Sequence, residues 1–148
     1  MGLNNHAQYQ VATKALLFRG DKLLVLLTPD NGIDFPGGRV DATEVDLSWH
    51  EALRRELDEE IGADVRVEMG RTLFVSKRTF HRPDNTTRIA AIFFECQYVS
   101  GDITLSDEHS THLWMTPQEL LTTDLEYVSG DEKSQLANYF ATTSNQTD

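Results

Sequence analysis

Short apolar runs bounded by turn residues recur along this chain, and the run over residues 88–99 is rich in β-branched and aromatic side chains. Such runs, bounded by turn residues, are typical of β-strands. The first two runs are joined by Arg19, Gly20 and Asp21, which predicts a hairpin near the start of the chain. The predicted strands cover residues 11–18, 22–28, 65–80, 88–99 and 113–115.

One segment, residues 48–61, has the apolar spacing of a helix instead. Ser48 and Glu51 fit the N-terminal capping box in which each side chain bonds the other's backbone, and Gly62 suits the position that ends a helix. Apolar residues recur at every fourth position between these caps and predict one buried stripe. The residues of this predicted stripe are Trp49, Leu53, Leu57 and Ile61.

The remainder of the pattern predicts two further helices and polar chain ends. Thr116 is the predicted N-cap of a helix over residues 117–121, and residues 131–140 predict a final helix. Residues 1–9 and 141–148 are polar and are expected to form tails. With 148 residues and no repeat or linker, the chain is expected to form one α/β domain, residues 1–148, with a mixed central β-sheet between helices.

Three carboxylates lie close together within the predicted long helix. Glu56, Glu59 and Glu60 are spaced so that they share one face of the helix, near the edge of the buried stripe. Like charges at this spacing repel one another, and charges near a core lose part of their hydration. A divalent cation would relieve both effects, since carboxylate oxygens are preferred ligands of Mg²⁺, Mn²⁺ and Ca²⁺. The alternative is a solvated acidic surface, which is the usual role of a charge run.

The net charge of −11 limits the partners of the chain. It argues against non-specific binding to nucleic acid or to an anionic membrane, and a polyphosphate would be repelled unless cations intervene. No apolar run has the length of a membrane span, and the N-terminal residues lack the apolar region of a signal peptide. Cys96 is the only cysteine, so no intrachain disulfide forms, and a cytoplasmic protein is expected.

The segment before the long helix completes a longer motif. Residues 35–38 read Phe-Pro-Gly-Gly, a sharp loop whose glycines allow close backbone approach to a ligand. With the helix that follows, this loop resembles the signature of the Nudix hydrolase superfamily, G-x5-E-x7-R-E-U-x-E-E-x-G-U, where U is a bulky apolar residue. Ten residues rather than seven separate Glu44 from Arg55, and Ala63 fills the last apolar position. The matching positions are Gly38, Glu44, Arg55, Glu56, Leu57, Glu59, Glu60 and Gly62.

This resemblance implies an α/β/α sandwich and a metal-dependent hydrolase of a diphosphate (pyrophosphate) linkage. The implied substrate is a nucleoside diphosphate derivative, attacked at phosphorus by water. Mg²⁺ is the implied metal, with Mn²⁺ as the alternative. Glu44 is expected to support the geometry of loop and helix, and Arg55 to orient Glu59 through an ion pair. The implied metal ligands are Gly38, Glu56, Glu59 and Glu60, and the implied catalytic residues are Arg55, Glu56, Glu59 and Glu60.

Other candidates lie outside the signature. Glu108 is a candidate for the extra carboxylate that Nudix enzymes often add from another loop, as metal ligand or general base, although a polar turn is the alternative. His109 and His112 are expected to be loop histidines without a partner. Arg78, Arg82 and Arg88 belong to a basic cluster that could contact substrate phosphate, or could only balance surface charge.

Two other function classes fit parts of the pattern. A Nudix-like domain whose catalytic residues have decayed can act as a nucleotide sensor, and the altered spacing before Arg55 keeps this alternative open. Isopentenyl diphosphate isomerase has a related fold but needs a catalytic cysteine, and Cys96 lies within an apolar strand. A homodimer is compatible with the sequence.

Overall fold

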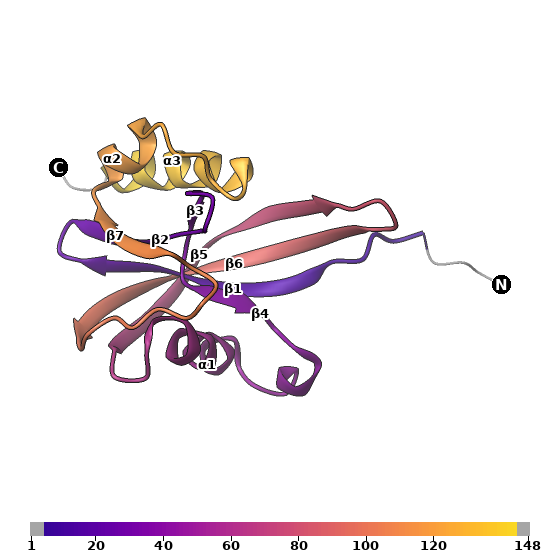
Figure 1. Cartoon of the computed structure of the whole chain (residues 1–148), viewed down its shortest axis with the longest axis horizontal. Helices are drawn as coiled ribbons and strands as arrows, with labels where there is room; N and C mark the ends of the chain where they lie inside the picture. The colour runs from indigo at the N-terminus through magenta and orange to yellow at the C-terminus, as the bar shows by residue number, and fades with distance from the viewer. Residues whose placement is uncertain (1–4, 145–148) are drawn as a thin grey trace.

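The strands of the protein form one mixed sheet in which helices cover both faces. The computed structural model describes residues 5–144, and Figure 1 shows α1 on one side of the sheet and α2 and α3 on the other. Neighbouring strands follow the order β3-β2-β1-β6-β5, with β4 paired to β1 and β7 to β2; only the β1–β6 pair is parallel. The elements are β1 (Gln10–Arg19), β2 (Lys22–Leu27), β3 (Ile33–Asp34), β4 (Gly37–Arg39), the 3-10 turn η1 (Ala42–Glu44), α1 (Trp49–Ile61), β5 (Arg66–His81), β6 (Thr86–Ser100), β7 (Thr111–Met115), α2 (Pro117–Thr122) and α3 (Gly130–Ser144).

The apolar runs of β1 and β2 are continuous because both faces of these strands are buried. Leu16 packs in the cluster beneath α2 and α3, whereas its neighbours Ala15 and Leu17 pack beneath α1. Leu136 and Phe140 of α3 belong to the first of these clusters. The predicted sandwich of a mixed sheet between helices is therefore confirmed.

The long helix forms as its sequence predicts, with one exception. Ser48 caps α1 in a complete capping box with Glu51, and Leu53 and the later residues of the stripe are buried against the sheet. The prediction that Trp49 is buried is wrong, because its side chain is 48% exposed. Trp49 is the first residue of α1, one turn before Leu53, and periodicity alone does not reveal where the covering surface ends.

The C-terminal helix is longer than its sequence predicts. α3 continues past residue 140 to Ser144, so the first part of the predicted polar tail is helical. The hydroxyls of Thr142 and Thr143 donate to the carbonyls of Asn138 and Tyr139, one turn earlier in the same helix. The rest of that predicted tail, residues 145–148, and residues 1–4 of the N-terminal tail lie outside the described residues.

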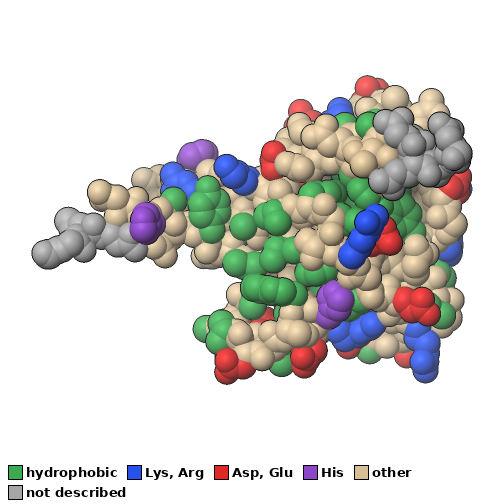
Figure 2. Space-filling view, turned by 180° about the vertical axis from the view of Figure 1, so that it is seen from behind, with side chains coloured by type: hydrophobic (Ala, Val, Ile, Leu, Met, Phe, Trp, Pro, Cys, Tyr) green, Lys and Arg blue, Asp and Glu red, His purple; other side chains and the backbone are tan. Residues whose placement is uncertain are grey.

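The long strands β5 and β6 form a hairpin that projects beyond the helical layers (Figure 1). β5 is an edge strand of the sheet, and its residues Val75 and Phe80 are partly exposed. Figure 2 shows apolar side chains along this projection and across the sheet between the two helical layers. None of the described helices is long and apolar enough to span a membrane.

Candidate functional site

The carboxylates of α1 meet the Pro-Gly-Gly loop at one cavity of about 450 Å³. The predicted loop is partly strand, because Gly37 and Gly38 belong to β4, which pairs with β1 and places Gly38 against Glu56 in the second half of α1. A Cβ atom at Gly38 would lie 2.4 Å from the Oε2 atom of Glu56, so only glycine leaves this carboxylate in place. Glu59, Glu60 and Glu108 also line the cavity.

Arg55 connects three of the acidic side chains. Its guanidinium pairs with Glu44, with Glu59 one turn later in α1, and with Glu56 at 3.0 Å. The predicted ion pair between Arg55 and Glu59 is therefore present. The geometry gives Glu44 a supporting position, because it holds Arg55 from η1 and does not itself line the cavity.

Of the carboxylates that line the cavity, Glu60 is the most deeply buried, with 5% of its surface exposed. Its Oε1 atom accepts a hydrogen bond from the backbone N–H of Gly37 at 3.2 Å. Burial raises the pKa of Glu60 to about 7, against the opposing effects of Lys14 and His109. Burial also raises the pKa of Glu56. Both pKa shifts indicate that the positive charge nearby does not offset the cost of burying these two carboxylates in their ionised form.

Lys14, whose charge favours the ionised form of Glu60, is already paired with Asp34, which is buried at the end of β3. Lys14 lies 3.3 Å from the Asp34 carboxylate and Arg78 lies 2.8 Å from it. Arg78 also pairs with Glu132 of α3, which is fully buried. The pKa of Asp34 is lowered well below its usual value, since these cations and a hydrogen bond from His109 outweigh the effect of burial. Lys14 and Arg78 thus balance Asp34 and Glu132, and Glu60 remains without a full counter-charge.

His109 belongs to the site rather than to an isolated loop. Its ring is buried, and its Nε2 atom lies 3.1 Å from Oδ2 of Asp34. His109 lies in a loop, as predicted, but it has a partner there, whereas His112 lies in β7, so the prediction that it is a loop histidine is wrong. One carboxylate oxygen each from Glu60 and Glu108 and a ring nitrogen of His109 lie within 4.8 Å of one another. This geometry brings Glu108 to the helix carboxylates, although the two segments are far apart in the sequence.

Of the three predicted substrate-binding arginines, Arg78 lines the cavity, and its donors bind Asp34 and Glu132. Arg82 lies in the exposed turn of the β5–β6 hairpin, and neither it nor Arg88 is among the described residues that line the cavity. Arg88 precedes Ile89, which does line it, and successive strand residues point to opposite faces.

The sequence pattern predicted no role for Lys14, Asp34 or Glu132, and it predicted no partner for His109. Lys14 and Asp34 are charged residues within or beside apolar strand segments. A charge in a strand that is buried on both faces needs a partner, and this was the available signal.

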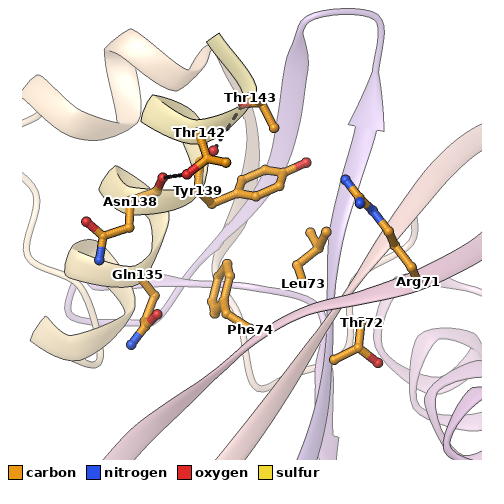
Figure 3. A pocket seen from close by; sticks show the side chains of 9 residues that line it. All are labelled: Arg71, Thr72, Leu73, Phe74, Gln135, Asn138, Tyr139, Thr142 and Thr143. Atoms are coloured by element: carbon orange, nitrogen blue, oxygen red, sulfur yellow. Dashed lines mark hydrogen bonds between the residues drawn. The ribbon is translucent and has the colours of Figure 1, made fainter. Parts of the chain in front are cut away.

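A second cavity, of about 300 Å³, lies between β5 and α3 (Figure 3). Arg71 is the charged residue in its lining and lies 3.8 Å from Glu95, to which the Tyr139 hydroxyl also donates a hydrogen bond. The carboxylates of the signature are absent from this lining, so we assign the functional site to the cavity beside α1. The full lining of the second cavity is Arg71, Thr72, Leu73, Phe74, Gln135, Asn138, Tyr139, Thr142 and Thr143.

The sequence matches the family model of the NUDIX domain over residues 8–136. The chain belongs to the Nudix hydrolase family. A MutT-like protein from Streptomyces ambofaciens is 33% identical over 115 residues, which cover 76% of this chain and 67% of that protein. These two matches make the chain a Nudix-type pyrophosphohydrolase, an enzyme acting on acid anhydrides.

Solved structures share the Nudix fold over nearly the whole chain. A MutT protein from Methanosarcina mazei Go1 has a TM-score of 0.73 at 23% identity, over 91% of this chain and 95% of that chain. An ADP-ribose pyrophosphatase from Streptococcus suis has a TM-score of 0.66 at 23% identity, over 92% of each chain. At these identities the similarity supports the fold and does not identify the substrate.

The Nudix site has the donor set of a divalent cation site. Glu56 and Glu60 are carboxylates whose pKa values are raised by burial, so a cation beside them would offset an unfavourable charge. Oxygen donors of this type suit Mg²⁺ and Mn²⁺. A bound cation would supply positive charge for phosphate oxygens and would lower the pKa of an attacking water.

Proposed function

We propose that this Nudix enzyme is a divalent-metal-dependent hydrolase of the diphosphate linkage in a nucleoside diphosphate derivative. One observation carries the proposal: Glu56, Glu59, Glu60 and Glu108, from two separate segments, line a single cavity. Mg²⁺ is the proposed metal, with Mn²⁺ as the alternative, and the proposed ligands come from Gly38 and from Glu56, Glu59 and Glu60. Water attacks phosphorus directly, with no covalent enzyme intermediate.

The dimensions and lining of the cavity support a nucleotide-sized substrate. Its volume of about 450 Å³ is within the range of small-molecule sites. Its lining adds apolar side chains, including Phe80 and Ile89, to the carboxylates. Phe80 is 37% exposed and can stack against a base, whereas Phe35 and Phe93 are fully buried in the core.

The residues around the metal ligands have positioning roles in this proposal. Arg55 holds Glu56 and Glu59 at fixed positions, and Glu44 holds Arg55. Arg78 fixes Asp34 from beneath the cavity. Arg82, which lies outside the cavity in the hairpin turn, would contact a part of the substrate that extends along the hairpin, whereas Arg88 points to the opposite face of its strand from Ile89 and has no role in this proposal.

A panel of diphosphate compounds tests the substrate class. ADP-ribose, a nucleotide sugar, a nucleoside triphosphate and a dinucleoside polyphosphate would each be incubated with Mg²⁺ or Mn²⁺, and the products identified by mass. ADP-ribose is included because the Streptococcus suis structure of similar fold is an ADP-ribose pyrophosphatase. We expect cleavage of at least one nucleoside diphosphate derivative, with loss of cleavage in EDTA.

Single substitutions test the metal ligands. Glu59→Gln and Glu60→Gln should each lower kcat by at least about 100-fold, which is about 2.7 kcal/mol of barrier. Asp58→Asn is the matched control, since Asp58 lies on the same helix and does not line the cavity. Near-normal turnover by both glutamine variants would contradict the ligand assignment. Tight nucleotide binding without turnover under either metal would instead indicate a sensor.

A further inference from the structure

His109 has a buried ring nitrogen that the protein leaves unbonded. The side chain is about nine-tenths buried, and its Nδ1 atom has no hydrogen-bond partner. Buried polar atoms are almost always paired, so an unpaired one calls for an explanation. A histidine that served only to pack the loop before β7 would not need an open nitrogen within a cluster of carboxylates.

The opposite ring nitrogen is held in a fixed direction. Nε2 lies 3.1 Å from Oδ2 of Asp34, and an ionised carboxylate can only accept a hydrogen bond. In the neutral ring, Nε2 therefore carries the proton and Nδ1 presents its lone pair. Asp34 itself is fixed by Lys14 and by Arg78. Histidines that bind metals usually donate their other N–H to a carboxylate in this way.

His109 belongs to a group of three side chains from two segments. A ring nitrogen of His109 and one oxygen each of Glu60 and Glu108 lie within 4.8 Å of one another. Because Nε2 is occupied by Asp34, Nδ1 is the nitrogen available to a ligand. We propose that His109 binds a divalent cation through Nδ1, in a site completed by Glu60 and Glu108. This inference rests on the proposed metal-dependent function and adds a nitrogen ligand that the Nudix signature does not contain.

A nitrogen ligand has a consequence for metal choice. Imidazole favours transition-metal ions, whereas Mg²⁺ prefers sites made of oxygen atoms alone. The enzyme should therefore bind Mn²⁺ or Co²⁺ more tightly than Mg²⁺, and His109 should account for much of the difference. Replacing His109 with Gln should weaken Mn²⁺ binding by about tenfold or more, with a smaller effect on Mg²⁺.

Pulsed electron paramagnetic resonance of bound Mn²⁺ tests the nitrogen directly and does not depend on turnover. Full-length protein would be prepared with natural histidine and with ¹⁵N-labelled histidine and loaded with Mn²⁺. The modulation of the Mn²⁺ signal by coordinated nitrogen would then be recorded. We expect a modulation that changes with the isotope in the parent protein. It should disappear in His109→Gln and persist in His112→Gln, the matched control from β7. The dissociation constants of Mn²⁺ and Mg²⁺ for all three proteins complete the experiment.

Each possible result supports or overturns the assignment of His109 as a metal ligand. Bound Mn²⁺ without nitrogen coupling in the parent overturns the role of His109 and leaves the proposed hydrolase intact, and this measurement does not need a folded variant. Nitrogen coupling that persists in His109→Gln also overturns it, because another histidine would then be the ligand. A parent protein that binds no Mn²⁺ contradicts both this inference and the proposed function.

Discussion

The unbalanced charge of Glu60 should make the metal-free protein less stable as the pH rises. Burial raises the pKa of Glu60 from 4.5 to about 7, so the folded state holds this proton more tightly than the unfolded state. The resulting stability is fully present below pH 4.5 and is lost as the pH rises through about 7. Glu60→Gln keeps the shape of the side chain and an oxygen that accepts from Gly37, and it removes the titration.

The size of the effect follows from the two pKa values. At about 1.4 kcal/mol for each pH unit between them, Glu60 should lower the free energy of unfolding by about 3 kcal/mol between about pH 4.5 and pH 8. The variant should not show this loss. For a domain of this length, the difference corresponds to about 6–12 °C in Tm. Other groups titrate in both proteins, so the difference between the two pH profiles isolates Glu60.

Urea unfolding in EDTA, repeated across this pH range, measures the effect. We expect the parent to lose stability relative to Glu60→Gln as the pH rises, and the difference to be largest above about pH 7. Metal should largely remove the difference, because a ligand that binds only the folded state at a hundred times its Kd adds about 2.7 kcal/mol, close to the loss caused by Glu60. Parallel pH profiles in EDTA would refute the argument that Glu60 lacks a counter-charge.

Four further predictions concern the metal ligands and the residues around them. Gly38→Ala should change Tm little but weaken Mn²⁺ binding measured by calorimetry, because the new Cβ meets only the carboxylate end of the Glu56 side chain and displaces it. Gly37→Ala should lower the free energy of unfolding in urea by at least about 2 kcal/mol, since its φ is +134° and its Cβ would meet backbone at 2.0 Å. Glu132→Gln should cost about 3 kcal/mol in the same assay, because it removes one of two anionic partners from a buried guanidinium. The metal-induced rise in Tm should nearly vanish in the Glu59→Gln, Glu60→Gln double variant, and an equal rise in both proteins would place the cation elsewhere.

Local pattern was enough to predict the elements that carry strong apolar periodicity or clear caps. The continuous runs of β1 and β2 and the capping boxes at Ser48 and Thr116 are local features, and the structure has each where it was predicted. The errors at Trp49 and at the end of α3 are both questions of where a covering surface ends. The end of a covering surface depends on how the elements pack against one another. The spacing of residues along one element carries no information about that packing.

The same distinction applies to the candidate site: residues within one helix could be predicted, and residues that the fold brings together could not. The helix carboxylates could be found because helical geometry fixes their spacing within one element. Asp34, His109 and Glu132 come from β3, the loop before β7 and α3, and they meet only because the sheet order places these segments together. Single residues of this kind have no local spacing that marks them. The charge of Lys14 within an apolar strand was the one sequence signal of this buried network.

The altered spacing of the Nudix signature leaves the contact between Glu44 and Arg55 in place. Residues 45–48 form the connection between η1 and α1, and Val45 in this segment is 71% exposed. Lengthening an exposed loop by a few residues costs little free energy. Glu44 still reaches Arg55, which in turn holds Glu56 and Glu59. Since the longer loop leaves these ion pairs intact, the insertion gives no structural reason to expect a decayed site.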